Sequence, residues 1–344
     1  MNFRFLLVTI LTTIYSCLAL NVDQCSEDDI FFTKTNMEIK NPNLTWQFTF
    51  TTDKPSKCFT GCKSHTKCQT ATFFEQRQEC QLKDANRFHP KSRFKLSPDA
   101  QMFEKRNCSV LDTGQNSNFI KAVPGTTDCL DVYRKGWKRD GVYGVKAGGD
   151  FYRPILCRMS LYGGGWTVFQ NRYDGSVPFN QPWKSYQEGF GDLRTEFWYG
   201  NDMLHNLTNG NSNQLLVYLK HNGLDYYPLY NQFNIGSEAN KYRLSISDEV
   251  YSNFGTRLPS FSFSLTHHNH NQFTTTDIDN DASGSRDCSN EGGGAGWWMA
   301  SCYSCNLNGA WGVDNNSGMK WHPLTNGCSK GCVRESTMLV RRRV

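Results

Sequence analysis

Three aspartates alternate within one short stretch of this chain, at Asp277, Asp279 and Asp281. Carboxylates this close together repel one another unless a cation lies between them. Calcium ions bind about six to eight oxygen ligands, which carboxylates and backbone carbonyls supply. The spacing therefore predicts a Ca²⁺ site, although an acidic stretch of this kind is more often a solvated turn.

The spacing excludes the EF-hand form of calcium loop. If Asp277 takes the first position of such a loop, Ala282 stands where the loop needs glycine. Cys288 then stands where the loop needs a bidentate glutamate. A Ca²⁺ ion at these aspartates would therefore need a different loop.

No group of residues in the sequence predicts a catalytic site. His267, His268 and His270 invite a metal interpretation, and the last two would share one face of a strand. Histidines without further ligands are more often structural. Zinc-protease, nucleophile-elbow and phosphate-loop motifs do not occur in the sequence. We therefore expect a protein that is not an enzyme.

Strand and helix patterns precede the acidic stretch. A glycine turn leads into an apolar run at residues 164–170, which predicts a central strand. Residues 215–219 and 242–246 predict two further strands, and residues 201–207 predict a short helix. The pattern predicts an α+β domain with a mainly antiparallel, twisted sheet and a loop-rich last third.

The N-terminal part is a separate cysteine-dense block. Its cysteines are Cys25, Cys58, Cys62, Cys68, Cys80 and Cys108. Residues 55–67 predict a short helix with two of these cysteines on one face. Residues 70–74 and 79–82 predict two strands around a turn. Spacing alone leaves the disulfide pairing open.

Composition and the N-terminus indicate an extracellular protein. The chain has 344 residues and a net charge of +5, too small a charge to predict nucleic-acid binding. Residues 1–19 have the pattern of a signal peptide, with an apolar segment too short to cross a bilayer. No later segment predicts a membrane span, so we expect secretion.

The cysteine count predicts one unpaired sulfur. Of the 14 cysteines, Cys17 would be lost with the signal peptide, which leaves an odd number. In an oxidising compartment most should pair within the chain. The remaining one would stay free or form a disulfide-linked homo-oligomer. Four sequons also predict N-glycosylation, at Asn43, Asn107, Asn206 and Asn315.

Residues 119–344 resemble the fibrinogen C-terminal-like domain, as found in fibrinogen chains, ficolins, tachylectins and angiopoietins. The shared motifs are TDCLDVY at 127–133, GGGWTVFQNR at 163–172, EFWYGND at 196–202, DIDND at 277–281, WW at 297–298 and NLNG at 306–309. The resemblance implies the disulfides Cys129–Cys157 and Cys288–Cys302.

The resemblance also implies the ligands of the Ca²⁺ ion. They are the carboxylates of Asp279 and Asp281 and the backbone carbonyls near Ser283 and Ser285. The loop is one residue longer here than in the family, so the carbonyl positions could differ by one.

A second implied site is a pocket for acetyl groups beside the calcium loop. In the family, two backbone N–H groups hold the acetyl oxygen, and these correspond to Cys302 and Tyr303. A cis peptide bond is implied at Ser301–Cys302. This chain departs from the pattern because Tyr303 replaces a usual histidine, and Cys305, Cys328, Cys332 and the sequon at Asn315 lie near the pocket. Acetyl-sugar binding is therefore left open.

Residues 25–108 resemble a PAN/apple domain, with an unrelated disulfide module as the alternative. The resemblance implies the pairs Cys25–Cys108, Cys58–Cys80 and Cys62–Cys68. A basic run at Arg87, Lys91, Arg93 and Lys95 could contact an acidic glycan, although such runs are more often solvated loops. Residues 109–118 are polar and predict a linker.

We therefore expect a disulfide-rich PAN/apple-like module followed by a fibrinogen C-terminal-like domain with a loop-rich calcium subdomain. The predicted function is that of a secreted, non-enzymatic, calcium-binding recognition protein whose ligands are glycans, acetylated ones included, or extracellular proteins. The alternative is a structural component of an extracellular, mineralised matrix.

Overall fold

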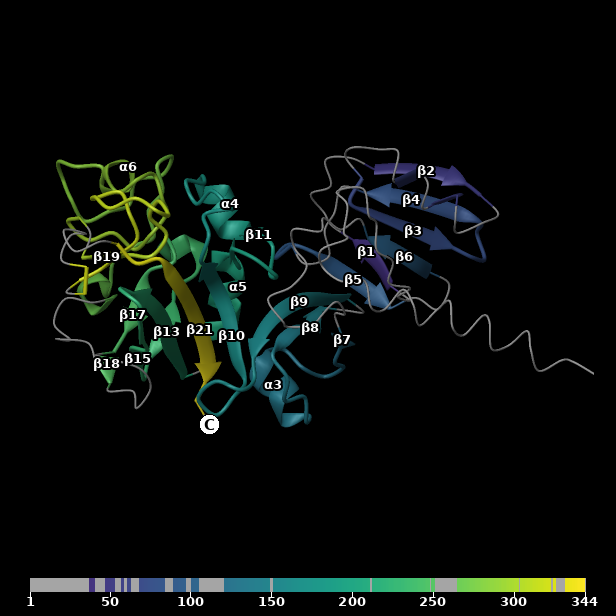
Figure 1. Ribbon diagram of the computed structural model, residues 1–344, viewed down its shortest axis with the longest axis horizontal. Coiled ribbons are helices and arrows are strands. Elements are labelled where there is room, and N and C mark those ends of the chain that lie inside the picture. Colours follow the sequence, from purple (N-terminus) through teal and green to yellow (C-terminus); the bar gives the residue numbers. More distant parts are fainter. Residues whose placement is uncertain are drawn as a thin grey trace, which may run out of the picture. The chain divides into compact units, whose positions relative to one another are not determined.

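The computed structural model describes residues 37–40, 47–52, 57–58, 61–62, 68–83, 89–96, 100–104, 121–148, 151–210, 212–247, 249–250, 265–302, 304–322, 324–325 and 332–343 (Figure 1). The predicted signal peptide, Cys25, Asn43, Asn107, Cys108, the linker, Tyr303 and Cys328 lie outside these residues. Among the described residues, no helix combines the length and the apolar character that crossing a membrane requires.

The chain forms two compact units. The second unit contains residues 117–344 together with 39–42 and 86–96. Residues 86–96 lie within the predicted PAN/apple-like stretch, 25–108, but pack with the unit that follows it. They belong to the second unit because β5 (Arg93–Leu96) pairs with β9 (Phe151–Arg158) through Phe94 and Tyr152.

The first unit is built on an antiparallel sheet with the strand order β2-β4-β3-β6. These strands are β2 (Gln47–Thr51), β3 (Thr70–Phe74), β4 (Glu79–Lys83) and β6 (Ala100–Glu104). Helical residues 57–58 and 61–62 carry two cysteines toward the sheet. The disulfides Cys58–Cys80 and Cys62–Cys68 are the pairs that the resemblance implied. Both lie in the core of this unit, beside buried side chains that include Phe73 and Leu82.

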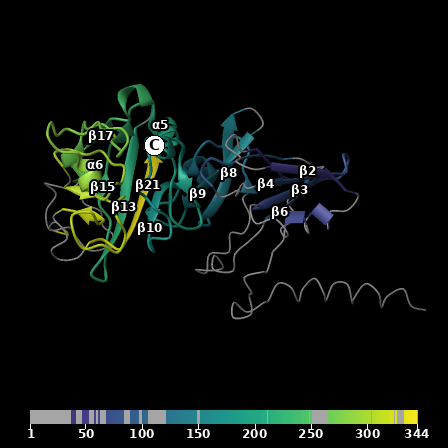
Figure 2. The same cartoon turned by 90° about the horizontal axis from the view of Figure 1, so that it is seen from above.

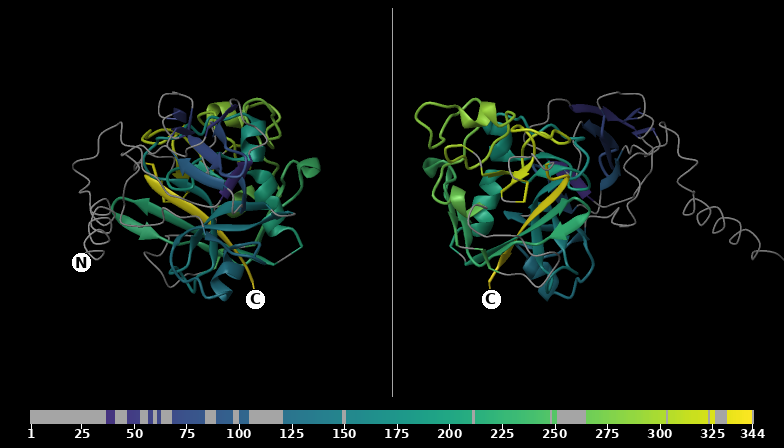
Figure 3. Two further views of the ribbon diagram at one scale, coloured as in Figure 1. Left: turned by 90° about the vertical axis from the view of Figure 1, so that its right-hand side faces the viewer. Right: turned by 60° about the vertical axis from the view of Figure 1, so that its left-hand side comes forward.

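The second unit is organised around β10 (Trp166–Arg172) and β21 (Glu335–Arg342). The main path of its sheet runs β1-β5-β9-β10-β21-β13-β15-β18. β21 lies between β10 and β13 (Asn213–His221) and is antiparallel to both, as Figures 1 and 2 show. Figure 3 marks the C-terminal end directly after this strand. The mainly antiparallel character of the predicted sheet is confirmed, and β7 and β8 are parallel to each other.

The other strands and the helices of the second unit are shorter or lie nearer the edges. The strands are β1 (Met37–Lys40), of which only the last two residues fall in this unit, β7 (Lys121–Ala122), β8 (Gly141–Gly148), β11 (Phe190–Gly191), β12 (Phe197–Trp198), β14 (Leu224–Tyr226), β15 (Leu229–Tyr230), β16 (Phe233–Ile235), β17 (Leu244–Ile246), β18 (Glu249–Val250), β19 (Cys305–Asn306) and β20 (Lys320–Trp321). The helices are α3 (Cys129–Arg134), α4 (Trp183–Glu188), α5 (Asn201–Thr208), α6 (Cys288–Glu291), and the 3₁₀ turns η4 (Glu238–Asn240) and η5 (Leu265–His268).

The strand predicted at residues 242–246 is shorter than expected. Lys241 and Tyr242 have φ angles of 52° and 48°, which no extended strand allows. β17 therefore begins at Leu244 and pairs with β16 in a separate two-stranded sheet.

Aromatic side chains join the sheet to the loop-rich region. Trp198 of β12 lies 5.7 Å from Phe169 of β10 and 6.1 Å from Trp298, measured between ring centroids. Trp297, Trp298 and Trp321 are buried. Large aromatic side chains contribute most of the apolar area in such a core, so the loop region is anchored to the sheet by packing.

Candidate functional site

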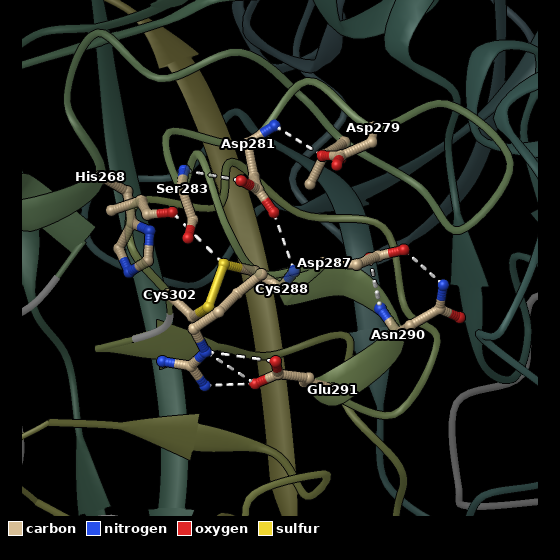
Figure 4. Close-up of a disulfide and its surroundings, with 12 residues drawn as sticks. His268, Asp279, Asp281, Ser283, Asp287, Cys288, Asn290, Glu291 and Cys302 are labelled. Atoms are coloured by element: carbon tan, nitrogen blue, oxygen red, sulfur yellow. Dashed lines mark hydrogen bonds and ion pairs between the residues drawn. A yellow bond between two sulfur atoms is a disulfide. The ribbon is translucent and has the colours of Figure 1, made fainter.

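The predicted calcium loop lies in the segment from η5 to α6, at the end of the domain away from α3 (Figures 1 and 4). Thr274 and Trp297 form a β-bridge at its base. The disulfide Cys288–Cys302, the pair that the resemblance implied, closes it. The segment is therefore held at its base while its acidic tip stays accessible.

Asp277 has a structural role within this segment. Its two carboxylate oxygens accept the backbone N–H of Trp183 at 2.9 and 3.2 Å, at the start of α4. One of them also accepts the Thr275 hydroxyl at 2.7 Å. The N-cap residue Pro182 supplies no side-chain acceptor, so Asp277 satisfies a donor that the helix start leaves open.

Asp279 and Asp281 shape the tip of the loop (Figure 4). Oδ1 of Asp279 accepts the backbone N–H of Asp281 at 3.1 Å. Asp281 accepts the N–H of Ser283 at 2.7 Å through one oxygen and that of Cys288 at 2.8 Å through the other. Both carboxylates therefore belong to one turn, and Asp281 ties that turn directly to the disulfide.

The donor set suits a hard cation. Each carboxylate oxygen has two lone pairs, so the backbone bonds of Asp279 and Asp281 leave acceptor capacity unused. Within the described part of the chain, the carbonyls of Ser283 and Ser285 accept no backbone hydrogen bond outside helices and strands. Groups of three or more His, Cys, Asp or Glu able to hold a metal are absent from the described residues. A Ca²⁺ ion here would need carbonyls and water beside the two carboxylates.

The helix α6 fixes the far side of the loop. Asp287 caps it by accepting the Asn290 N–H at 2.9 Å. Arg286 and Glu291 form an ion pair across the same turn. Cys288 is buried at the first position of the helix, so the helix places the disulfide beneath the acidic tip.

The residues of the implied acetyl pocket lie just after the disulfide. The Ser301–Cys302 peptide bond is cis, as the resemblance implied. Ser301 is exposed and Cys302 is buried. Tyr303, which would supply the second N–H donor, lies outside the described residues.

His268 holds the segment that follows Cys302. Its Nδ1 donates to the Trp298 carbonyl at 2.7 Å, and its Nε2 accepts the Cys305 N–H at 3.0 Å. Burial lowers the pKa of His268 to about 4, so the ring is neutral at physiological pH. The structural interpretation of this histidine is therefore confirmed.

The NLNG motif forms a buried link between the loop region and β10. Gln170 donates to the Leu307 carbonyl at 3.1 Å, and Arg172 donates to the Gly309 carbonyl at 3.1 Å. Asn308 donates to the Gly296 carbonyl at 2.9 Å. The motif therefore positions the loop region, a role that the residue types alone did not reveal.

Of the cysteines near the pocket that depart from the family pattern, one is a free thiol and another forms a disulfide. Cys305 is free and fully buried, and burial raises the pKa of its thiol well above the usual value. Cys332 is disulfide-bonded. Nearby Lys320 is also buried, which lowers its pKa to about 8. The complete burial of Cys305 makes it a poor candidate for a bond to another protein molecule.

The structure describes the side chains of two predicted glycosylation sites and of two residues of the predicted basic run. Asn206, in α5, and Asn315, whose Oδ1 accepts the Ser317 N–H at 2.8 Å, are both exposed. In the basic run, Lys91 pairs with Glu188 at 2.5 Å. Arg93 donates to the carbonyls of its own turn. These two cations thus have partners inside the second unit, contrary to a freely solvated basic loop.

Comparisons with known proteins agree with both resemblances. The profile of the C-terminal globular domain of the fibrinogen beta and gamma chains matches residues 125–343, and that of the PAN domain matches residues 31–108. Ryncolin-4 of Cerberus rynchops is 39% identical over 53% of this chain and 50% of its own length. Human ficolin-3 is 36% identical over 59% of this chain and 66% of its own length.

The chain spans about half the length of ryncolin-4 and of human fibroleukin, which is 38% identical. Among solved structures, the fibrinogen-like globe domain of human ANGPTL6 aligns with a TM-score of 0.58 and 31% identity. That alignment covers 66% of this chain and all of the globe domain. Together with the antiparallel sheet and its disulfides, these matches show that the chain belongs to the family of fibrinogen C-terminal globular domains, with a PAN domain before it.

Proposed function

We propose that the protein is a secreted, non-enzymatic recognition protein that binds glycans or extracellular proteins through a calcium-ordered loop. Its kinship with ficolins and ryncolins supports a lectin-like role. The observation that carries the proposal is the placement of Asp279 and Asp281 in one partly exposed turn, which a hydrogen bond from the Cys288 N–H to Asp281 ties to the disulfide. A cation at the tip would therefore stabilise the loop that leads to Ser301 and Cys302.

The first test removes the charge of both carboxylates. Asp279→Asn with Asp281→Asn keeps side chains that accept hydrogen bonds but weakens Ca²⁺ binding. Because a ligand bound only to the folded state stabilises it, millimolar Ca²⁺ should raise the Tm of the native protein and not that of the double variant. Differential scanning calorimetry in Ca²⁺ and in EDTA measures both.

The matched control is Asp174→Asn with Asp225→Asn. Both residues are exposed, and each accepts one hydrogen bond, from the Ser176 N–H and the Tyr218 hydroxyl respectively. The control should keep the full Ca²⁺ shift. Identical melting of the native protein in Ca²⁺ and EDTA would rule out the metal.

The choice of ligand rests on a separate measurement. A glycan array with the native protein, in Ca²⁺ and in EDTA, should show Ca²⁺-dependent binding of acetylated sugars if the pocket near Cys302 is intact. A Ca²⁺ shift in Tm without glycan binding would instead favour a structural component of an extracellular, mineralised matrix.

A further inference from the structure

The end of α3 and the turn after it concentrate positive charge on the surface of the second unit. Residues 134–139, the cationic turn, contain four exposed cations, which are Arg134, Lys135, Lys138 and Arg139. No carboxylate interrupts this segment. So dense a basic segment is typical of surfaces that contact polyanions, although many such segments are only solvated. The two cases differ in whether nearby carboxylates neutralise the charges and whether the backbone holds them in place.

The carboxylates nearest the cationic turn are engaged by other residues. Asp128 and Asp131 both bind Arg342. Asp140 lies 3.6 Å from Arg158. Among the residues that the structure describes, none of the four cations of the turn forms an ion pair. Because six cations thus face three carboxylates, this surface keeps an excess of positive charge.

Backbone hydrogen bonds hold the cationic turn in one conformation. Gly136 ends α3 with a φ of 91°, and its N–H donates to the Tyr133 carbonyl at 3.1 Å. The Trp137 N–H donates to the Val132 carbonyl at 3.3 Å. The two bonds together form the Schellman motif that commonly terminates a helix at glycine. The cations are therefore carried on a fixed backbone, which lowers the entropic cost of binding a ligand.

Arg341, near the end of β21, extends this surface. Lys138 lies over the Tyr133 ring, with its Nζ 3.0 Å from the ring centroid. Arg341 is an electrostatic neighbour of the same phenol, and it donates to the carbonyl of Gly164, where any side chain would collide with the Tyr133 ring. The acceptors of Arg341 among the described residues are carbonyls and an amide. Its charge therefore adds to that of the turn.

We propose that the cationic turn and Arg341 bind a linear sulfated polysaccharide. Cations spread over an open surface bind a polymer of anionic groups more tightly than one small anion, because the polymer contacts several of them at once. The planar fork of an arginine also suits the oxygens of an oxyanion. Access to such a polymer rests on the proposed secretion, but the surface shares no residue with the acidic loop and needs no calcium.

The aromatic and apolar contacts that other polyanions use are missing from the described part of this surface. Single-stranded nucleic acids stack their bases on aromatic rings. Tyr133 and Trp137 are half-buried, under Lys138 and against Tyr143 respectively. Segments that bind a membrane surface carry an apolar face beside their cations, whereas the exposed large apolar side chains of the described residues all lie in other elements. A sulfated polysaccharide needs neither kind of contact.

Isothermal titration calorimetry of the full-length protein in EDTA tests this binding apart from the calcium loop. A heparin octasaccharide should bind at low salt, and its affinity should fall as the salt concentration rises, because the contacts are exposed charges. The same octasaccharide without its sulfate groups should bind far more weakly. Failure of the sulfated form to bind would overturn the proposal. A DNA duplex of similar length that binds as tightly would overturn the assignment to a polysaccharide.

Arg134→Gln with Arg139→Gln should weaken binding of the sulfated octasaccharide about tenfold, the scale of two exposed ion pairs. Neither side chain forms a hydrogen bond or ion pair among the described residues, so the Tm should stay that of the native protein. The matched control is Lys184→Gln with Arg243→Gln, which removes two exposed cations from other elements of the same unit. The control should bind as the native protein does. Equal losses in the two variants would show that net charge alone attracts the polymer and would overturn the site.

Chemical footprinting locates the polymer without any substitution. A lysine-specific acetylating reagent should modify Lys135, Lys138 and Lys184 in the free protein, because all three are exposed. Mass spectrometry after addition of the octasaccharide should show protection of Lys135 and Lys138 and continued modification of Lys184. Unchanged modification of the two lysines of the turn would contradict the proposed location, even if the polymer binds.

Discussion

His268 shows how one residue can hold a functional loop without touching a ligand. Its ring bridges the carbonyl of Trp298 and the N–H of Cys305, so it spans the disulfide-closed segment. A proton on Nε2 would remove the acceptor for Cys305 and place a charge in a fully buried position, where burial keeps the pKa low. The loop after Cys302 is therefore sensitive to acid.

A decrease in pH should destabilise the second unit through this residue. The pKa of His268 is about 4 in the folded protein, against about 6.5 in an unfolded chain. The unfolded state thus takes up its proton first. The stabilisation is complete above about pH 6.5 and is lost as the pH falls toward 4, amounting to about 3 kcal/mol at most.

Urea unfolding in EDTA, compared between pH 7.5 and pH 4.5, measures this effect. His89, whose pKa is also lowered to about 4, mainly by burial, adds to the slope in the same direction. His268→Gln should be less stable at pH 7.5 but lose less stability on acidification. His267→Gln removes an exposed neighbour whose charge is a lesser cause of the lowered pKa of His268, so it should retain most of the native slope. Equal slopes for native protein and His268→Gln would contradict the role assigned here.

At the scale of elements, α4 depends on a carboxylate that is remote in sequence. Asp277 accepts the N–H of Trp183, where a helix normally uses its own N-cap side chain. Asp277→Ala should therefore lower the free energy of unfolding by about 1 kcal/mol, within the usual range for a lost cap. Equilibrium unfolding in urea measures the loss.

Variants of Asp277 can distinguish its role from the roles of Asp279 and Asp281. Asp277→Asn keeps an acceptor and should cost less than Asp277→Ala. Both variants should retain the Ca²⁺-induced rise in Tm, because the Asp277 carboxylate is hydrogen-bonded to the first residue of α4 and is not a predicted Ca²⁺ ligand. Loss of that rise in Asp277→Asn would show that this carboxylate binds the metal after all.

Local sequence patterns predicted the positions of strands and helices better than they predicted which of these segments contact one another. The apolar runs of β10 and β13 identified both strands, and residues 201–207 identified α5, because these signals lie within a few residues. The pairing of β5 with β9 and the contact of Asp277 with Trp183 join distant segments, which periodicity does not encode. A local pattern also failed at Tyr242. Alternating residues predicted a strand from this position, but its positive φ is incompatible with an extended strand.

A buried network illustrates what residue types could not reveal. Glu196 is fully buried and accepts the backbone N–H groups of Tyr173, Asp174, Gly175 and Val177 at 2.7–3.2 Å. It also lies 3.6 Å from Arg172. The motif that contains Glu196 was recognised by resemblance, but its role in organising this turn follows only from the fold.

For the whole molecule, the odd cysteine gives a prediction that revises the expectation of covalent dimers. Cys305 is free and fully buried. A thiol-specific reagent should therefore react with about one thiol per molecule in denaturant and with almost none in the native protein. Cys305→Ser should abolish that signal and leave migration on a non-reducing gel unchanged. A covalent dimer that disappears in Cys305→Ser would instead show that this thiol reaches the surface.

The central position of β21 has a consequence for how the protein is made. This strand lies between β10 and β13, yet it is the last strand of the sheet to leave the ribosome. Until it emerges, β10 and β13 each present an unpaired edge, and such edges favour aggregation. Chaperones should therefore hold the nascent domain until synthesis reaches residue 342. A message truncated before that point would yield polypeptides that retain the acidic loop but not the sheet that supports it, and cellular quality control should degrade them.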